Sequence, residues 1–165
     1  MFLIRRLRSD EWRAYRDIRL RALQDSPQAF GSTFEVESAK LDDYWEARLA
    51  AAAKSPHQSP LIAEEGTRKV GLVWVWIDPE RTDEAHVIQM WVAPEVRGQG
   101  CGARLVEAAV DWARERKVRS IHLRVTCGDT AAVRLYQRAG FQPVGDPEPL
   151  RPSSVELAQP MRLDL

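Results

Sequence analysis

Three glycines on alternate positions constrain this chain most strongly, because they stand directly before a segment with a helical pattern. Residues 97–103 read RGQGCGA. Glycine in regular structure costs about 0.5–1 kcal/mol relative to alanine, so the run indicates a tight turn, a close backbone approach, or both. The helix that follows leaves its first N–H groups without internal partners and presents the positive end of its dipole. We therefore expect an anion site, and a phosphate is the anion expected there.

Two familiar phosphate-binding motifs do not fit this stretch. A nucleoside triphosphate loop ends in Gly-Lys-Ser or Gly-Lys-Thr, which does not follow these glycines. A dinucleotide fold carries its glycine turn after the first strand of a parallel sheet. Here the turn lies past the middle of the chain, behind residues 69–78 and 85–94, which we expect to form an antiparallel strand pair. The residues alone predict a phosphate and little more.

Composition limits the kinds of protein that this chain can be. Its 165 residues, 44% of them apolar, suit one compact domain over residues 1–165. Lys plus Arg equals Asp plus Glu at 24 each, so no net charge favours nucleic acid or an anionic membrane. The N-terminal apolar run is too short for a signal peptide, and no run of about 18 apolar residues occurs, so we expect a cytoplasmic protein. Two cysteines and three scattered histidines predict neither a disulfide framework nor a metal site.

Periodicity and turn residues predict an α/β (α+β) chain. Ser9 and Asp10 supply capping residues for the first helix, Pro60 opens an edge strand, and Asp129 can cap the last helix. The expected strands are residues 2–7, 60–65, 69–78, 85–94 and 120–127 with a final pair near the C-terminus, and the expected helices are 11–24, 41–54, the segment after Gly102, and 129–138.

The segment between the first two helices is expected to contact a substrate. Residues 25–40 form a long loop with aromatic anchors, and long loops in compact domains often carry binding residues. Phe30, Ser32 and Phe34 are the substrate-binding candidates, with a packed connection as the alternative interpretation. The arginines of the first helix are interpreted as a solvated face.

Two motifs resemble those of the GNAT superfamily of N-acetyltransferases. The stretch MWVAPEVRGQGCGARLV is similar to the family's Gln/Arg-x-x-Gly-x-Gly/Ala motif, which Arg97, Gly100 and Gly102 match. Downstream, DTAAVRLYQRAGF resembles the family's Asn-x-x-Ala-x-x-Leu-Tyr-x-x-x-Gly-Phe segment, and the matching residues are Ala132, Leu135, Tyr136, Gly140 and Phe141. The order of elements agrees over essentially the whole chain.

The resemblance implies a fold and a co-substrate. The fold is a mixed, mostly antiparallel central sheet of six to seven strands with about four helices on both faces. A parted parallel strand pair, around residues 85–92 and 120–126, forms a slot for CoA. The co-substrate is acetyl-CoA, with no metal. Its pantetheine arm pairs with the backbone of Met90, Trp91 and Val92, and its pyrophosphate lies on the amides of Arg97, Gly98, Gln99, Gly100, Cys101, Gly102 and Ala103.

The resemblance also implies catalytic roles. Tyr136 matches the tyrosine that lies near the CoA sulfur and can protonate the departing thiolate. The amine must be deprotonated, and Glu84 or His86 can do this, since Glu84, His86, Ile88 and Met90 share one face if their strand has no bulge; a water chain is the alternative. The chain departs from the family at Asp129, where an asparagine usually contacts pantetheine. For Cys101, a small packing residue is favoured over a reactive thiolate.

We expect an acetyl-CoA-dependent N-acetyltransferase that acts by direct attack of a primary amine of a small molecule or a peptide. Two alternatives stay open: a non-catalytic acyl-CoA-binding sensor or interaction module, and an enzyme that uses a longer acyl-CoA. The acceptor is not identified by the sequence. We expect neither a nucleic acid nor a membrane partner, and the apolar C-terminal segment is compatible with a homodimer.

Overall fold

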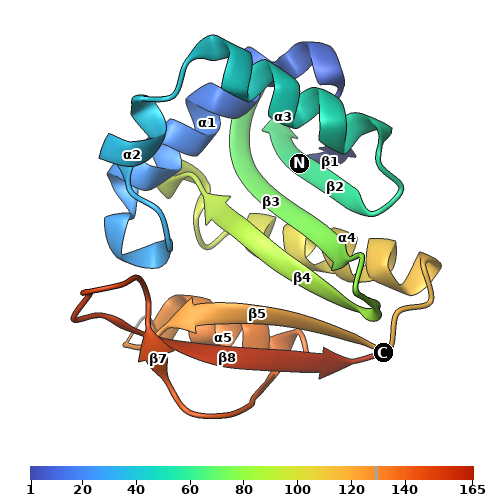
Figure 1. Ribbon diagram of the computed structural model, residues 1–165, viewed down its shortest axis with the longest axis vertical. Helices are drawn as coiled ribbons and strands as arrows, with labels where there is room; N and C mark the ends of the chain where they lie inside the picture. Colours follow the sequence, from blue (N-terminus) through green and yellow to red (C-terminus); the bar gives the residue numbers. More distant parts are fainter. Residues whose placement is uncertain (129) are drawn as a thin grey trace.

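A computed structural model describes residues 1–128 and 130–165, and its centre is one twisted sheet (Figure 1). Within these residues the sheet has eight strands in the order β1-β2-β3-β4-β5-β8-β6, with β7 beside β8. Every pairing is antiparallel except that of β4 with β5. The strands are β1 (Leu3–Arg6), β2 (Gln58–Glu65), β3 (Arg68–Asp78), β4 (Arg81–Val92), β5 (Ser120–Thr126), β6 (Gln142–Pro143), β7 (Glu148–Pro149) and β8 (Leu157–Asp164).

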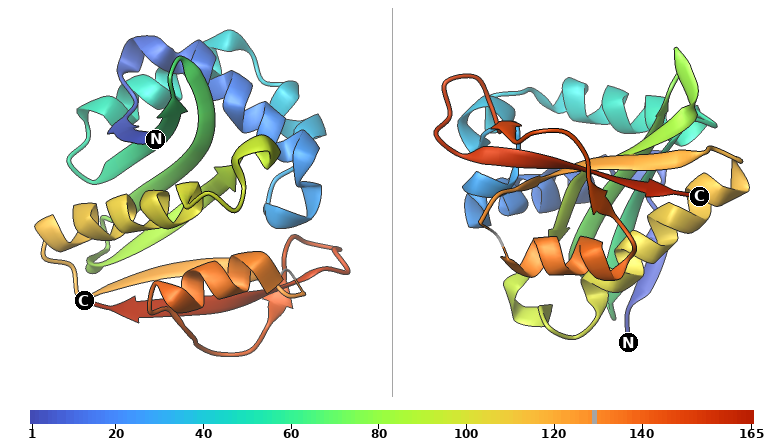
Figure 2. Two further views of the ribbon diagram at one scale, coloured as in Figure 1. Left: turned by 180° about the vertical axis from the view of Figure 1, so that it is seen from behind. Right: turned by 90° about the horizontal axis from the view of Figure 1, so that it is seen from below.

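Helices cover both faces of this sheet, as expected. Figure 1 shows α1, α2 and α3 over the upper half of the near face, and the reverse view in Figure 2 shows the gold α4 and orange α5 across the far face. The helices are α1 (Trp12–Asp25), α2 (Phe34–Ser38), α3 (Asp42–Lys54), α4 (Cys101–Glu115) and α5 (Thr130–Arg138), and the 3-10 turns are η1 (Ser9–Glu11), η2 (Pro27–Ala29) and η3 (Pro94–Val96).

The predicted mixed, mostly antiparallel architecture is confirmed, but both element counts are higher in the described residues. The additional strand material is β6 and β7, which have two residues each and carry no sequence periodicity. The additional helix is α2, inside the segment predicted as a loop. Thr33 caps it by accepting a hydrogen bond from Val36 N at 3.3 Å, and Glu35 and Glu37 favour its positive N-terminus.

Two local predictions were wrong. The segment entered through Pro60 is not an edge strand, because β2 pairs with both β1 and β3. The Pro60 carbonyl accepts a hydrogen bond from Leu7 N at 2.9 Å, so Pro60 faces the β1 side just beyond the end of that strand. The proline is tolerated because no residue of β1 lies opposite its missing N–H. Ser9 and Asp10 form the turn η1 before α1, and neither side chain caps that helix.

The core lies on both faces of the sheet. On the near face Tyr15 packs its ring against Trp45 and Trp74, at centroid distances of 5.6 and 5.3 Å. On the far face α4 buries an apolar stripe against β3 and β4. Within the described residues, no helix is long and apolar enough to cross a bilayer. The two packed faces hold β3 and β4 rigid, so the edge of β4 that faces β5 is fixed in place.

Candidate functional site

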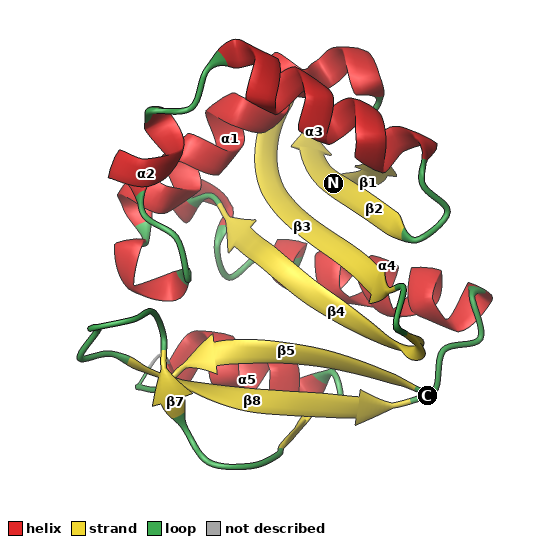
Figure 3. Cartoon of the chain, in the orientation of Figure 1, coloured by secondary structure: helices red, strands yellow, loops and turns green. Residues whose placement is uncertain are grey.

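The two parallel strands part after a short pairing. β4 and β5 are paired only over Glu84–His86 and Ser120–His122, and beyond these residues they diverge, as Figure 3 shows. A cavity of about 540 Å³ opens where they separate. Because the strands no longer pair there, this edge of β4 is free of a neighbouring strand. The predicted parted strands are confirmed.

The cavity brings together both sequence motifs. β4 contributes Met90, Trp91 and Val92, and α5 contributes Leu135 and Tyr136. From the glycine turn and the start of α4 come Arg97, Gly98, Gly100, Cys101, Gly102 and Ala103. Thus residues from two segments about 30 positions apart line one space. Gln99 does not line the cavity, because its side chain turns back to Glu95 O at 3.4 Å, and Asp129 lies outside the described residues.

The three glycines serve two different purposes. Gly98 and Gly100 have φ values of 76° and 86°, a conformation that L side chains rarely adopt, and a Cβ on either would meet no protein atom within 4 Å. Gly102 lies inside α4, where a Cβ would come within 3.2 Å of Leu135 Cδ2. The first two therefore shape an open turn, and the third allows α4 and α5 to approach closely.

Four arginines line the cavity, and two of them, Arg97 and Arg124, form ion pairs with Asp25 and Glu148. Arg97, Arg124, Arg134 and Arg138 all lie on its wall. Arg134 and Arg138 are four residues apart on α5 and so share one helix face, a spacing visible in the sequence but not used there. Together with the N-terminus of α4, these guanidinium groups suit a ligand that carries several phosphate charges. The residues present thus fit a polyphosphate-bearing co-substrate.

Arg97 is fixed by a partner from a distant segment. Its Nη2 donates to Asp25 Oδ2 at 2.6 Å, and its Nε donates to Val92 O at 3.0 Å. Trp91 Nε1 donates to the same Asp25 oxygen at 3.1 Å. Burial opposes the charge of Asp25, but hydrogen bonds from Ser26, Trp91 and Arg97 outweigh it and lower the pKa of this carboxyl. Asp25 therefore ties the end of α1 to the cavity, a role that no local pattern indicated.

A bulge in β4 decides which side chains face which way. Leu72 pairs with Trp91 and Trp74 pairs with Ile88, so β4 has an additional residue between them, and Gln89 has a φ of 55°. Ile88 consequently lies on the near face with Trp74, whereas Met90 turns to the far face, where its Cε would lie 3.6 Å from a Cβ on Gly102. The predicted common face therefore holds for Glu84, His86 and Ile88, whereas Met90 points to the opposite face of the sheet.

Tyr136 and Cys101 are both buried at the cavity wall. The Tyr136 side chain is 6% exposed, and its ring packs edge-on against Phe141 at 5.9 Å. Burial raises the pKa of the Cys101 thiol, which favours a small packing residue over a reactive thiolate. Of the two, the tyrosine is the one with a polar group suited to proton transfer.

The two base candidates lie at the closed end of the strand gap. His86 stacks on Trp76 with a centroid distance of 4.8 Å and lies 5.6 Å from the ring of His122. His122 Nε2 lies 2.9 Å from Ser120 Oγ and 4.0 Å from Glu84 Oε2. Burial lowers the pKa of His86, and the neighbouring His122 lowers it further. A neutral imidazole is therefore held on the near face; sequence reasoning missed His122, although its alternation along the strand was visible.

The proposed acceptor residues lie beside the cavity rather than on its wall. Phe30 is buried under the Arg19 guanidinium, whose Cζ is 4.8 Å from the ring centroid, and its carbonyl accepts from Arg151 Nη1 at 2.7 Å. Phe34 lines a separate hollow, and Ser32 is half-buried nearby. Ser26 and Ala29 reach the cavity in their place. A substrate contact through Phe30, Ser32 or Phe34 stays a prediction.

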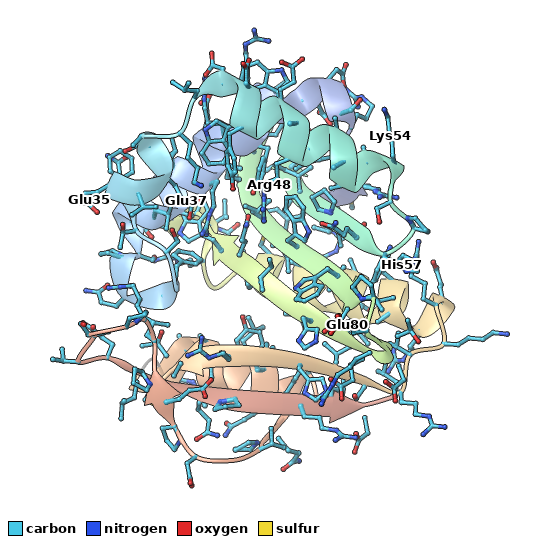
Figure 4. The ribbon with its side chains drawn as sticks, in the orientation of Figure 1. Glu35, Glu37, Arg48, Lys54, His57 and Glu80 are labelled. Carbon is cyan, nitrogen blue, oxygen red and sulfur yellow. The ribbon has the colours of Figure 1, made fainter. Side chains whose placement is uncertain are left out.

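The arginines of α1 do not form a purely solvated face. Arg19 is 4% exposed and makes a two-pronged ion pair with Glu37 of α2, with Nε–Oε1 and Nη2–Oε2 distances of 3.0 and 2.7 Å. In Figure 4, Glu37 and Arg48 lie on the same near face of the sheet, over its upper half. The helix period alone could not show this, because α2 was not expected.

Across the residues that the structure describes, no group of three or more His, Cys, Asp or Glu side chains is placed to hold a metal ion.

Comparisons with known proteins point to one family. The family model described as "Acetyltransferase (GNAT) family" matches residues 5–141. A provisionally named ribosomal protein bS18-alanine N-acetyltransferase of Bacillus subtilis is 27% identical over 114 residues, covering 68% of this chain and 74% of that protein. A mycothiol acetyltransferase of Clavibacter sepedonicus is 29% identical over 134 residues, covering 81% of this chain but 40% of its own length.

Solved structures share the fold. A GNAT-family acetyltransferase from Streptococcus pneumoniae superposes with a TM-score of 0.87 at 21% identity, covering 100% of this chain and 99% of that one. A Salmonella typhimurium acetyltransferase, solved with acetyl-CoA, superposes with a TM-score of 0.81 at 18% identity and covers 100% of this chain and 94% of that one. At these identities the likeness concerns the fold.

Proposed function

The chain belongs to the acetyltransferase (GNAT) family, and from this premise we propose that it transfers an acetyl group from acetyl-CoA to a primary amine of a small molecule or a peptide. The observation that carries the proposal is the gap between β4 and β5, on whose wall the glycine turn and Tyr136 meet. We also propose that residues 1–165 act as one domain.

The cavity residues have distinct binding roles in this proposal. The turn amides of residues 97–103, with Arg134 and Arg138, hold the pyrophosphate. The edge of β4 from Met90 to Val92 binds the amide-bearing pantetheine arm through its backbone, as an added strand would. Bound acetyl-CoA supplies an acetyl group activated as a thioester. Ser26 and Ala29 at the near-face opening indicate the side from which the amine enters.

The catalytic roles belong to residues on both sides of the gap. The Tyr136 hydroxyl donates a proton to the departing sulfur, and its buried ring holds the hydroxyl in place. His86 or Glu84 accepts a proton from the amine, directly or through water; the neutral His86 is suited to this because burial keeps it unprotonated. A backbone amide near Val92 polarises the carbonyl under attack. Orientation of the two reactants supplies much of the remaining acceleration.

A thiol-release screen tests the proposal. The protein is mixed with acetyl-CoA and pooled amines, free thiol is measured, and the acetylated product is identified by mass spectrometry. Amine-dependent thiol release supports the enzyme. Acetyl-CoA binding without thiol release across the panel favours the non-catalytic sensor. Competition between acetyl-CoA and longer acyl-CoA compounds decides the donor.

The acceptor is the part that the relatives leave open. Their names refer to the alanine of ribosomal protein bS18 in one case and to mycothiol in the other, which are different kinds of molecule. The cytoplasmic location and the homodimer also stay predictions from the sequence.

A further inference from the structure

Polar side chains from three elements meet on the near face, beside the bulge of β4. We call Tyr15, Arg19, Arg48 and Gln89 the near-face cluster. The Tyr15 hydroxyl donates to Gln89 Oε1 at 2.9 Å, across 74 positions of the sequence. Burial raises the pKa of Tyr15, while the charges of Arg48 and Arg19 oppose that shift, so both guanidinium groups lie near its hydroxyl. None of the four residues is on the cavity wall described above, but Gln89 directly precedes Met90, which lines the cavity from the far face, so the cluster lies one residue away from that wall along β4.

The cluster has more positive charge than its neighbours neutralise. Glu37 is fully engaged by Arg19 in the two-pronged pair. Arg48 lies over the Trp74 ring at 4.6 Å and makes no ion pair within the described residues. Among the described residues, the cluster thus has two guanidinium groups and one neighbouring carboxylate, Glu37, whose charge also acts on Arg48.

Two buried N–H groups of the cluster have no acceptor among the described residues. Arg19 Nη1 and Arg48 Nε are buried, and no described residue accepts a hydrogen bond from either. The Gln89 amide uses its oxygen to accept from Tyr15, which leaves its nitrogen as a further donor of the half-buried side chain. A buried donor without an acceptor costs free energy, and buried polar groups are nearly always paired. The arrangement is thus that of a site with one partner missing, an anionic acceptor of hydrogen bonds.

We propose that the near-face cluster binds a carboxylate of the amine acceptor, so that the substrate is an amino acid rather than a polyamine, an aminoglycoside or a peptide terminus. The proposal rests on the proposed function, because it concerns the acceptor of that same site. Arg48 and Gln89 donate to the carboxylate, and Ile88, exposed on the same face, lies between them and the base candidates. A planar guanidinium matches a carboxylate in geometry as well as charge. The same positive charge repels a cationic polyamine.

Matched pairs of amines test this. Alanine, β-alanine and γ-aminobutyrate are each compared with their carboxamides, by thiol release from acetyl-CoA and by calorimetric binding to the CoA-loaded protein. We expect at least one acid to exceed its amide about tenfold or more in kcat/KM. Arg48→Gln should lower kcat/KM for that acid about tenfold to a hundredfold, through KM, and leave the amide unchanged. Arg48→Lys, which keeps the charge but not the fork, should fall in between.

Arg114→Gln is the control, because Arg114 is exposed on the far-face helix α4 and pairs with Asp111. The melting temperature of Arg48→Gln should fall only modestly, since the change removes a buried donor that has no acceptor together with the contact of Arg48 with the Trp74 ring. The proposal is overturned if amides, polyamines or peptides are preferred, or if Arg48→Gln lowers acid and amide equally. Acids that bind in an Arg48-dependent way without any thiol release would instead overturn the acetyl-transfer function and leave the carboxylate site standing.

Discussion

The two sides of the strand gap are built in contrasting ways. On the far side, the proposed ligand-binding groups are mostly backbone amides and glycines from one short run, with arginines one helix turn apart on α5. On the near side, Tyr15, Arg19, Glu37, Arg48 and Gln89 come from four elements and act through their side chains. A site made from the backbone depends on local chain geometry, whereas a site made from side chains depends on packing. Substitutions on the far side should therefore lower ligand affinity. Substitutions on the near side should lower stability or change substrate specificity.

The largest expected effect is on the stability of the near side. Glu37→Ala leaves Arg19 buried without its partner and should lower the free energy of unfolding by about 3–5 kcal/mol. Asp164→Ala removes an exposed carboxylate at the same 2.7 Å distance from Arg162 and should cost about 1 kcal/mol or less. Urea denaturation measures both. Equal losses of unfolding free energy in the two variants would show that the buried Arg19–Glu37 pair contributes no more to stability than an exposed pair.

The next effect concerns turnover. Tyr136→Phe keeps the ring against Phe141 but removes the hydroxyl, and should lower kcat about a hundredfold or more with little change in acetyl-CoA affinity. Tyr44→Phe, the same change on α3 outside the cavity, is the control. Steady-state kinetics and calorimetry separate the two quantities. An unchanged rate of acetyl transfer would remove Tyr136 as the acid.

A smaller effect tests the backbone site alone. Gly100→Val places a branched side chain at a φ of 86° and in the open space where the ligand is expected. Its CoA affinity should fall about tenfold or more, or about 1.4 kcal/mol. Gly66→Val is a matched control, since Gly66 has a φ of 61°, also has nothing within 4 Å of its Cβ position, and lies outside the cavity. Both variants should lose about 1–2 kcal/mol of stability. Equal CoA affinity in the two would contradict the phosphate site.

The smallest expected effect is on the pH dependence of kcat/KM. Burial and His122 hold the pKa of His86 below its ordinary value of 6.5, so His86 is neutral at pH 7 and takes a proton only in more acidic solution. If His86 is the base, kcat/KM should fall below pH 6.5, and His86→Gln should remove that descent. Because the unfolded chain binds the proton more readily, this residue also lowers stability as pH falls from 6.5 through the lowered pKa. A descent that persists in the variant assigns the proton to Glu84 or to water.

The sequence predicted the part of the candidate site that depends on local chain geometry. The glycine turn, the helix after it and the strands on either side were predicted from spacing, since each depends on residues close together in the chain. The tight turn at Gly98 and Gly100 also followed, because a positive φ is a backbone requirement, whereas the close contact of Gly102 with α5 was not predicted.

The near side was harder to predict from the sequence, because its geometry depends on residues that are far apart in the chain. The bulge at Gln89 reverses the direction of the side chains in β4, and no residue type near it predicts a bulge. The pairing of Arg19 with Glu37 needs α2, a helix of five residues that is too short for a periodic pattern. Asp25 and Arg97 are 72 positions apart, so their contact exists only after folding.

The short pairing of β4 with β5 has a consequence for how the protein exchanges hydrogen with solvent. Strand amides are protected by their neighbours, yet after His86 the β5-facing amides of β4 have no strand beside them. These amides should exchange rapidly in the free protein and slowly once a ligand bridges the gap. Their protection factors would then report, one peptide group at a time, which part of the gap a given acyl-CoA fills.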